Sequence, residues 1–469
     1  MTHPPKRFPG RAEIAAVRAE AERLDPGQEA GERRRVAGRV LARRGHGKLT
    51  FLDVVDRSGR IQLLCAEDRC GPVDVDLGDI VGAEGAPTRT RRGEPSLAAD
   101  ELVLLAKTER PLPDVYHGLT DTETRYRKRY LDLAVNEETR RAFITRSRMV
   151  AAIRRWLDER GFLEVETPVL QPRYGGAFAR PFVTHHNELG ADLYLRIATE
   201  LYLKRLIVGG LEKVYELGKD FRNEGISYKH QPEFTMLEWY EAYANFEDTM
   251  ERVERLVQDV ALDVLGTTEV AFRGHQVDLR VPWRRVRLPD AFAKLGLWTR
   301  DEAELRTRLE ARGIETGGDR TWAQLIDHAL SSLIEPTLIQ PTFVHDYPIE
   351  LSPFARTFDD DPLLVERFEY FAAGMELGNG YTEINTAAEQ AERFAAQQIE
   401  REAGDELALE GDPDYVEALT YGMPPTGGIG LGIDRLAMLF TGRETIRDVV
   451  LFPALRQPSS ERDVPVSGE

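Results

Sequence analysis

A short segment near the middle of the chain combines groups that could hold a nucleoside triphosphate. Arg222 and Glu224 flank one asparagine, and His230 and Phe234 follow in the same segment. A guanidinium can pair with a phosphate through two hydrogen bonds, a carboxylate can accept from an amino group, and a phenyl ring can stack on a purine. A surface hairpin with an ordinary ion pair would contain the same residue types. This segment therefore raises nucleotide binding as a hypothesis that other parts of the chain must support.

The residues on both sides of this segment alternate as they do in paired strands. The alternation covers residues 214–218 before the segment and 234–240 after it. We therefore expect two antiparallel strands joined by a loop at residues 225–232. The strand period of two would then place Arg222 and Glu224 on one face.

Short strand-like segments separated by turn residues fill the first part of the chain. Glycine, serine and proline punctuate the turns, for example at residues 56–59 and 92–95. Five strands in so short a stretch predict a small Greek-key barrel of the oligonucleotide-binding (OB) type, preceded by a helix at residues 11–24. The expected strands are 36–41, 49–55, 60–66, 79–84 and 96–106.

The length of the chain predicts more than one domain, because 469 residues exceed the size at which single cores usually stop growing. Two closely spaced prolines at residues 110–114 resist both helix and sheet and predict a stiff linker. We divide the chain into a helix and barrel domain at 1–109, a linker at 110–125 and a second domain at 126–469.

The second domain is expected to mix helices and strands. Apolar residues from Met149 to Leu157 repeat at helical spacing, Gly161 ends that helix, and residues 162–165 continue as a strand. Two further helical stretches, at 301–311 and 321–334, are expected to form an insertion at about 280–345.

The charge pattern is uneven along the chain. The net charge is −18, yet basic residues gather at 33–48 and again at 89–92. That distribution predicts a nucleic-acid-binding end on an otherwise acidic protein, although a solvated basic face would have the same composition.

The sequence indicates neither a membrane protein nor a protein of an oxidising compartment. The chain has no apolar run approaching the ~20 residues that cross a bilayer and no signal-like start, so we expect a cytoplasmic protein without a membrane partner. Cys65 and Cys70 are the only cysteines, and we expect two reduced thiols rather than a disulfide or a zinc site.

Three separated segments occur in an order that resembles a known enzyme class. Residues 161–168, 221–238 and 430–435 resemble the three signature motifs of class II aminoacyl-tRNA synthetases. Within that class, the stretches 126–133, 179–187, 200–205 and 369–385 are similar to bacterial lysyl-tRNA synthetases, and the resemblance runs from about residue 33 to 453.

The resemblance implies an α+β protein that acts as a homodimer. Its N-terminal five-stranded OB-fold barrel would bind the anticodon of tRNA(Lys), and its class II catalytic domain would contain an antiparallel sheet flanked by helices. The first-motif helix would pack across the two-fold axis. The implied reaction joins L-lysine and ATP into lysyl-adenylate, releases pyrophosphate, and transfers the lysyl group to the 3′ end of the tRNA. No protein nucleophile is needed, since the lysine carboxylate itself attacks the α-phosphorus.

The resemblance also implies roles in nucleotide and metal binding. Arg222 would hold the α-phosphate and, with Arg435, would be catalytic; Arg435 would also cover the second face of the adenine ring. Two glutamates would hold Mg²⁺ together with the phosphates of ATP, because magnesium prefers oxygen ligands. The implied ATP ligands are Arg222, Glu224, His230, Phe234, Glu376 and Arg435, and the implied metal ligands are Glu369 and Glu376.

A lysine side chain would require acids at the end of its pocket, because an unpaired ammonium is costly to bury. The resemblance assigns this task to Glu200 and Glu383, while Tyr240 and Tyr381 would line the aliphatic stem. Gly176 and Asn379 would meet the α-amino and carboxylate groups. The complete implied set is Gly176, Glu200, Glu238, Tyr240, Asn379, Tyr381, Glu383 and Gly430.

In the barrel, Phe51, Gln62 and Glu94 match positions that contact anticodon bases. Single-stranded bases are recognised by stacking and by hydrogen bonds to their free edges. An aromatic residue in a short strand is also commonly a core residue, so packing inside the barrel is the alternative interpretation of Phe51.

The chain departs from the family pattern at two positions. Thr199 stands where many relatives have proline, and Met375 stands where a basic residue is common; we expect both to be tolerated. Two other functions remain open at this point: a lysine-activating enzyme with a protein or lipid acceptor, and an inactive paralogue that only binds RNA.

Overall fold

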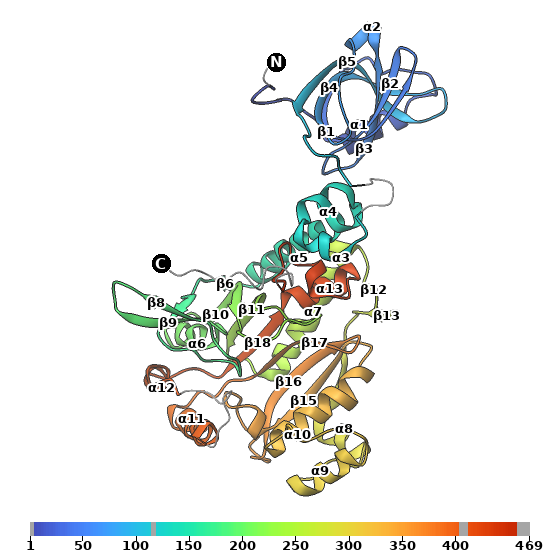
Figure 1. The fold of residues 1–469 in the computed structure, drawn as a ribbon. Coiled ribbons are helices and arrows are strands. Elements are labelled where there is room, and N and C mark those ends of the chain that lie inside the picture. Colours follow the sequence, from blue (N-terminus) through green and yellow to red (C-terminus); the bar gives the residue numbers. More distant parts are fainter. Residues whose placement is uncertain (1–3, 114–118, 403–410, 457–469) are drawn as a thin grey trace, which may run out of the picture. The chain divides into compact units, whose positions relative to one another are not determined.

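A computed structural model describes residues 4–113, 119–402 and 411–456 of the chain (Figure 1). The expected linker at 110–125 therefore lies partly outside the described residues. The chain separates into two compact units, residues 1–139 and 140–469. Each unit is described by itself below.

The first unit is built on a closed five-stranded barrel with the strand order β1-β2-β3-β5-β4. Pairing is antiparallel except between β3 and β5, which run parallel. Helix α1 (Ile14–Glu22) contributes Ile14 and Val17 to the barrel core. The strands are β1 (Arg34–His46), β2 (Leu49–Val55), β3 (Arg60–Ala66), β4 (Ile80–Arg89) and β5 (Pro95–Ala106).

The expected OB-type barrel is thus confirmed, with its helix and all five strands at the anticipated places. Three short helices complete the unit: α2 (Glu67–Cys70), α3 (Thr122–Arg127) and α4 (Arg129–Val135). Cys65 is buried and Cys70 partly buried, and both are free thiols, as expected.

The second unit contains an eight-stranded sheet in the order β14-β15-β16-β17-β18-β11-β10-β6. Its six central strands pair antiparallel, and only the outermost pairs, β14–β15 and β10–β6, are parallel. The strands are β6 (Leu163–Glu164), β10 (Lys213–Phe221), β11 (Glu233–Ala242), β14 (Arg284–Arg287), β15 (Thr342–Pro348), β16 (Leu364–Ala372), β17 (Met375–Thr382) and β18 (Thr426–Gly432).

Helices flank this sheet (Figure 1), which confirms the α+β prediction. They are α5 (Glu137–Asp158), α6 (Glu200–Val208), α7 (Phe246–Leu265), α8 (Leu288–Lys294), α9 (Glu302–Glu310), α10 (Trp322–Ala329), α11 (Ala387–Glu402), α12 (Pro413–Thr420) and α13 (Ile433–Thr441). Two small sheets accompany them: β12 (Glu269–Phe272) with β13 (His275–Asp278), and β7 (Leu170–Gln171), β9 (Ala191–Leu195) and β8 (Val183–His186). Among the described residues, no helix is long and apolar enough to cross a membrane.

Helix α7 illustrates how local sequence signals set one of these elements. The Asn245 side chain caps the first turn by accepting from the main chain of Glu247 and Asp248, and the Asp248 carboxylate accepts from the main-chain N–H of Asn245. Gly266 ends the helix with φ = 73°, a left-handed conformation that glycine adopts without strain. The apolar stripe between these caps packs on the sheet and forms part of the main core.

The structure adds detail to two expectations about this unit. The apolar face of α5, which includes Met149, Ile153 and Trp156, is buried in the core of the same unit, so packing of this helix across a two-fold axis would need other residues and stays a prediction. The proposed insertion at 280–345 also contains strands β14 and β15 of the main sheet. Only the helices between those strands, starting at Leu288, lie outside the sheet.

Candidate active site and anticodon-binding groove

One face of the central sheet gathers most of the predicted active-site residues in two rows. Glu369, Asn379, Gly430 and Glu238 lie opposite one another on β16, β17, β18 and β11. Two residues further along, the second row contains Arg367, Tyr381, Gly428 and Tyr240. Both rows share one face because side chains alternate with a period of two.

The intervening residues point to the opposite face and build the core. Ile429 and Leu431 are buried there, together with Leu237 and Trp239 of β11. A one-residue slip in register would exchange these apolar side chains with the polar rows, so burial of the core fixes the geometry of the site.

The first cavity brings together all six predicted ATP ligands. Its lining includes Arg222, Glu224, His230, Phe234, Glu376 and Arg435. The guanidinium of Arg222 lies 5.0 Å from the centre of the Phe234 ring. Its Nε is buried and makes no hydrogen bond within the described chain, so a donor remains available to a ligand.

The hairpin prediction is confirmed for β10 and β11, but not for Arg222 and Glu224. Strand β10 ends at Phe221, so both residues belong to the connecting loop. A main-chain hydrogen bond of 2.8 Å from Glu224 to Arg222 folds this loop back on itself. The loop path, and not strand alternation, therefore directs the two side chains into the cavity.

Arg435, Glu376 and His230 form a connected group in this cavity. Arg435 Nη1 donates to Glu376 Oε2 at 2.9 Å, and Arg435 Nη2 lies 3.3 Å from His230 Nε2. Partial burial and the neighbouring Arg435 lower the pKa of His230 to about 4, so its ring is neutral at physiological pH. Burial acts to raise the pKa of Glu376, but Arg435 outweighs it and the pKa is lowered overall.

The two predicted metal ligands lie on neighbouring strands and are each held by an arginine. Arg367 Nη2 donates to Glu369 Oε1 at 2.8 Å, while Arg435 holds Glu376. Burial raises the pKa of Glu369 to about 7, and Glu376 adds to this effect against the opposing charge of Arg367. Glu376 lines the first cavity, and Glu369 lies on the neighbouring strand without lining it. Two carboxylates on adjacent strands fit Mg²⁺, which typically takes one or two protein carboxylates and completes its shell with phosphates and water.

A second cavity contains seven of the eight predicted lysine ligands: Gly176, Glu200, Glu238, Tyr240, Asn379, Tyr381 and Gly430. Gly176 has φ = +86°, and a Cβ there would lie 3.1 Å from the Cβ of Glu200. Glycine is therefore needed at this wall of the cavity.

Glu238 is a buried acid whose two oxygens are both occupied. The main-chain N–H of Thr199 donates to Oε1 at 3.2 Å, and the Tyr240 hydroxyl donates to Oε2 at 3.2 Å. Burial raises the pKa of Glu238 to about 8, and the nearby acids Asp220 and Glu200 add to that rise. Proline at position 199 could not donate the first hydrogen bond, so this departure from the family pattern has a direct structural consequence.

Glu383 lies close to this cavity but is absent from its lining. Its Oε2 is ion-paired with Nζ of the fully buried Lys204, which also donates to Glu200 Oε1 at 2.6 Å. The role of Glu383 as a direct lysine ligand therefore stays a prediction.

The two cavities meet at three shared residues, Arg222, Met236 and Asn379. Arg222 is the residue predicted to hold the α-phosphate. A nucleotide in the first cavity and an amino acid in the second would thus approach each other near Arg222, where the attack on the α-phosphorus is expected.

Several polar residues that support these cavities were not predicted from the sequence. Arg146 of α5 donates to Asp434 at 2.5 Å, and Asp434 in turn accepts from the main chain of Thr235 at 2.8 Å. Lys204 follows Glu200 by four residues, so a helix predicts that the two side chains are neighbours. Its second partner, Glu383, is distant in the sequence and could not be predicted in this way. Arg367 likewise stood two residues before Glu369.

The three predicted anticodon-binding residues, Phe51, Gln62 and Glu94, line one groove on the barrel. Phe51 is partly exposed there, while the next residue, Leu52, is fully buried in the barrel core. The alternation of β2 therefore places Phe51 on the outer surface, which argues against the core interpretation.

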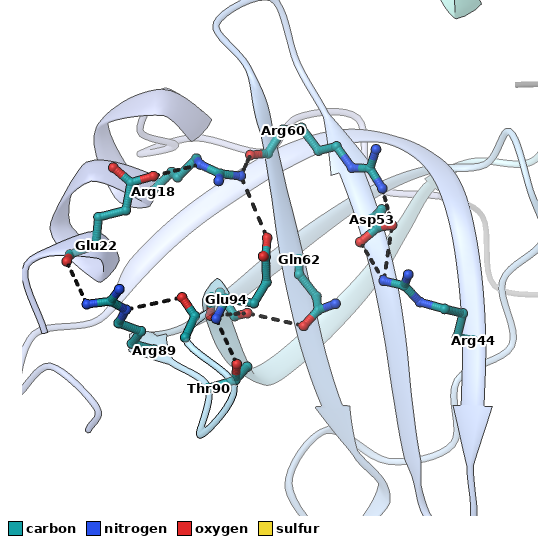
Figure 2. Close-up of polar contacts among 11 residues, drawn as sticks. Arg18, Glu22, Arg44, Asp53, Arg60, Gln62, Arg89, Thr90 and Glu94 are labelled. Atoms are coloured by element: carbon teal, nitrogen blue, oxygen red, sulfur yellow. Dashed lines mark hydrogen bonds and ion pairs between the residues drawn. The ribbon is translucent and has the colours of Figure 1, made fainter. Parts of the chain in front are cut away.

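Polar contacts hold the other two residues in the groove (Figure 2). The Ser96 hydroxyl donates to Gln62 Oε1 at 3.3 Å, and Arg18 of α1 lies 3.8 Å from Glu94. Arg44 and Arg60 both pair with the buried Asp53 beside Gln62. Arginines next to a partly exposed aromatic ring are suited to a single-stranded nucleic acid.

Comparisons with known proteins show the family to which the chain belongs. Residues 121–456 match the family described as tRNA synthetases class II (D, K and N), and residues 35–105 match the OB-fold nucleic acid binding domain family. The chain is 51% identical to a lysine–tRNA ligase of Roseiflexus sp. (strain RS-1), with 92% of this chain and 91% of the relative covered. It is also 50% identical to the lysine–tRNA ligase of Moorella thermoacetica (94% and 91% covered) and 49% identical to that of Haemophilus influenzae strain PittGG (92% and 88% covered).

Proposed function

Because the chain belongs to the class II aminoacyl-tRNA synthetases and, among them, to the lysine–tRNA ligases, we propose that its two adjoining cavities bind ATP and L-lysine and bring them together at Arg222. The enzyme catalyses the aminoacylation of tRNA(Lys). The observation that supports the assignment of the site is the junction of the two cavities at Arg222, Met236 and Asn379.

In the first step the lysine carboxylate attacks the α-phosphorus of ATP and displaces pyrophosphate. Phe234 and Arg435 hold the adenine between them, and Glu224 accepts from its amino group. Arg222 holds the α-phosphate with its free Nε and compensates the charge that develops there. The protein thus contributes alignment and charge stabilisation, and no side chain needs to form a covalent bond.

The remaining groups orient the two substrates. The neutral ring of His230 lies beside Arg435 and contacts the distal phosphates. Glu369 and Glu376 hold Mg²⁺, which when bound neutralises phosphate charge. In the second cavity Glu200 faces the ε-ammonium, Tyr240 and Tyr381 line the stem, and Gly176, Glu238, Asn379 and Gly430 surround the α-amino and carboxylate groups.

In the second step the 3′-terminal hydroxyl of tRNA(Lys) attacks the mixed anhydride and takes the lysyl group. The barrel contributes by binding the anticodon, with Phe51 stacking on a base and Gln62 and Glu94 hydrogen-bonding to base edges.

A homodimer and a cytoplasmic location complete the proposal. Leu163, Val169 and Leu170 follow the first-motif helix and are 50%, 42% and 47% exposed, which is an apolar surface suited to a second copy of the chain. Charging of tRNA for translation places the enzyme in the cytoplasm.

The decisive experiment is lysine-dependent exchange of labelled pyrophosphate into ATP, followed by charging of purified tRNA(Lys). Exchange and charging together are expected. Exchange without charging would favour an enzyme that transfers lysine to another acceptor. Absence of both, in a protein that still binds tRNA, would favour an inactive RNA-binding paralogue.

A further inference from the structure

The proposed α-phosphate ligand, Arg222, is held differently from the other two arginines of the site. Arg435 donates to Glu376, and Arg367 donates to Glu369. The Nε of Arg222, in contrast, is buried and has no hydrogen-bond partner within the described chain. A group that orients Arg222 and still leaves this donor for a substrate would act through charge or packing.

Asp220 is a buried acid beside this arginine. It lies in β10 directly opposite Phe234 of β11, and residues paired in this way lie on the same face of a sheet. The guanidinium of Arg222 lies 5.0 Å from the centre of the Phe234 ring. Phe234 therefore has Asp220 beside it in the sheet and Arg222 over its ring. The side chain of Asp220 is 1% exposed and is absent from the lining of both cavities.

Arg196 lies against β10 and is ion-paired with Asp220. Arg196 Nε lies 3.2 Å from Asp220 Oδ1, but it donates its hydrogen bond to the main-chain oxygen of Lys219 at 2.9 Å. Arg196 Nη1 donates to Glu216. A side chain at position 218 would collide with Arg196 Nη2, so Gly218 makes room for the guanidinium. Arg196 thus compensates the charge of Asp220, while both Asp220 oxygens lack a hydrogen bond within the described chain.

The Asp220 carboxylate is ionised at the mildly alkaline pH of a typical assay. Burial raises the pKa of Asp220 to about 6 against the opposing charges of Arg196 and Arg222, and Glu216 adds to the rise. At pH 8 the carboxylate is therefore mostly charged. A buried carboxylate without hydrogen bonds is costly unless cations compensate it, and Arg196 is already shared with Glu216. Arg222 is the second cation that compensates Asp220.

From this geometry we infer that Asp220 is a positioning residue for Arg222: its carboxylate, anchored by Arg196, holds the Arg222 guanidinium over Phe234 by charge and leaves the Nε donor for the α-phosphate. An acid that accepted a hydrogen bond from this Nε would orient the arginine as well, but would occupy the donor. The inference rests on the proposed function, because it concerns the arginine that holds the α-phosphate of ATP and of lysyl-adenylate. Asp220 contacts neither substrate and acts through Arg222.

Asp220→Asn removes the charge and keeps the shape of the side chain. The probe is L-lysinol adenylate, an unreactive analogue of lysyl-adenylate that keeps the phosphate, and calorimetry at pH 8 gives its Kd. Asp220→Asn should weaken binding by about tenfold or more, since a buried charge that orients the phosphate ligand is lost. It should also slow single-turnover adenylate formation by about 10–100-fold, because a small misplacement near the reacting atoms is costly. The KM for lysine should stay within about twofold, since ground-state binding of lysine is not affected.

A double-variant cycle separates action through Arg222 from a general effect on the fold. In the Arg222→Gln background, Asp220→Asn should change the Kd of lysinol adenylate by less than about twofold, because the group that Asp220 positions is already gone. A tenfold loss in that background as well would overturn the inference.

The matched control is Glu216→Gln. Glu216 lies on the same face of β10 as Asp220 and shares Arg196 with it, but it pairs in register with Glu238 and not with Phe234. Its effect on the Kd should be the same with and without Arg222→Gln. A dependence on Arg222 as large as that of Asp220→Asn would contradict the assignment to Asp220.

Thermal unfolding followed by circular dichroism checks that each variant folds. Asp220→Ser, a smaller neutral replacement, repeats the cycle if Asp220→Asn does not fold. Failure of the wild-type protein to show lysine-dependent pyrophosphate exchange would refute the proposed function. Exchange by the wild type, together with independent effects of Asp220→Asn and Arg222→Gln, would refute only the positioning role.

Discussion

The guanidinium of Arg435 is bound twice by Glu376. Arg435 Nη1 donates to Glu376 Oε2 at 2.9 Å and to the Glu376 main-chain oxygen at 2.8 Å. Arg435 lies in α13 and Glu376 in β17, so this contact joins the third signature motif to the strand that contains the proposed metal ligand. The arginine that we propose to face the nucleotide is therefore oriented without a ligand, which would avoid reorganisation during the reaction.

Replacing Arg435 by glutamine should lower the rate of adenylate formation by about 10²–10³-fold, because one of the two arginines proposed to be catalytic loses the preorganised charge that holds the nucleotide. Lysine affinity should remain, since Arg435 does not line the second cavity. Single-turnover formation of lysyl-adenylate measures the first effect, and calorimetry measures the second. The control is Arg155→Gln, an exposed arginine of α5 that pairs with Asp263. Equal losses in both variants would contradict the assigned role.

Magnesium should bind more tightly as the pH rises through about 7. The pKa of Glu369 is raised to about 7 by burial, so protons compete with the metal below that pH. The Mg²⁺ concentration that gives half-maximal exchange should fall between pH 6 and pH 8, by at most about tenfold per pH unit. Glu369→Gln should need more Mg²⁺ and lose this part of the pH dependence. Glu366→Gln, on the same strand but not among the residues predicted to hold the metal, should retain it.

Glu238 should make the folded state less stable at high pH. Its pKa in the folded protein is about 8, above the unfolded value of ~4.3, because burial favours the neutral acid. The stability from this proton is complete below the unfolded pKa and is lost as the pH rises through 8. Glu238→Gln should therefore gain ~1–3 kcal/mol of unfolding free energy over wild type between pH 5 and pH 9. Urea unfolding at both pH values tests this, and an equal difference at the two values would rule it out.

His230 should remain neutral in the free enzyme down to about pH 5. Partial burial and Arg435 lower its pKa to about 4, below the unfolded value of ~6.5. The folded protein therefore favours the neutral ring. The stability that the neutral ring provides is present above pH 6.5 and is lost as the pH falls toward 4, because protonation then favours the unfolded chain. Bound triphosphate brings negative charge, which should raise the pKa and cause proton uptake when ATP binds near pH 5.5. Calorimetry in two buffers of different ionisation enthalpy measures this uptake, and His230→Gln should abolish it.

Phe51→Ala should weaken tRNA(Lys) binding by ~1–3 kcal/mol, because stacking on one base is lost. Pyrophosphate exchange should not change, since the groove belongs to the barrel and not to the two cavities. Phe8→Ala provides the control, because Phe8 packs on Arg35 and lies outside the groove. The KM for tRNA in the charging reaction compares the two variants. Loss of exchange in Phe51→Ala would show that the substitution acts through folding.

The elements of the protein were largely predictable because their signals are local. Residue spacing and turn residues are enough to recognise three kinds of element. These are the five barrel strands, the hairpin of β10 and β11, and helix α5, which ends just before Gly161. The three signature motifs then indicated the family, and with it most of the predicted ligands that line the two cavities, although Glu369 and Glu383 line neither. The loop position of Arg222 and Glu224 was not foreseen, because alternation does not show where a strand stops.

The sequence by itself therefore determined the two folds, the family and the kinds of side chain available for chemistry. Only the tertiary structure decided how those charges are paired: Arg435 with Glu376, Arg367 with Glu369, and Lys204 with both Glu200 and Glu383. It also decided that the apolar face of α5 packs in the core of the second unit. The physical reason is that burial and electrostatic pairing depend on distances between residues far apart in the chain, which the register of the sheet sets and local patterns do not contain.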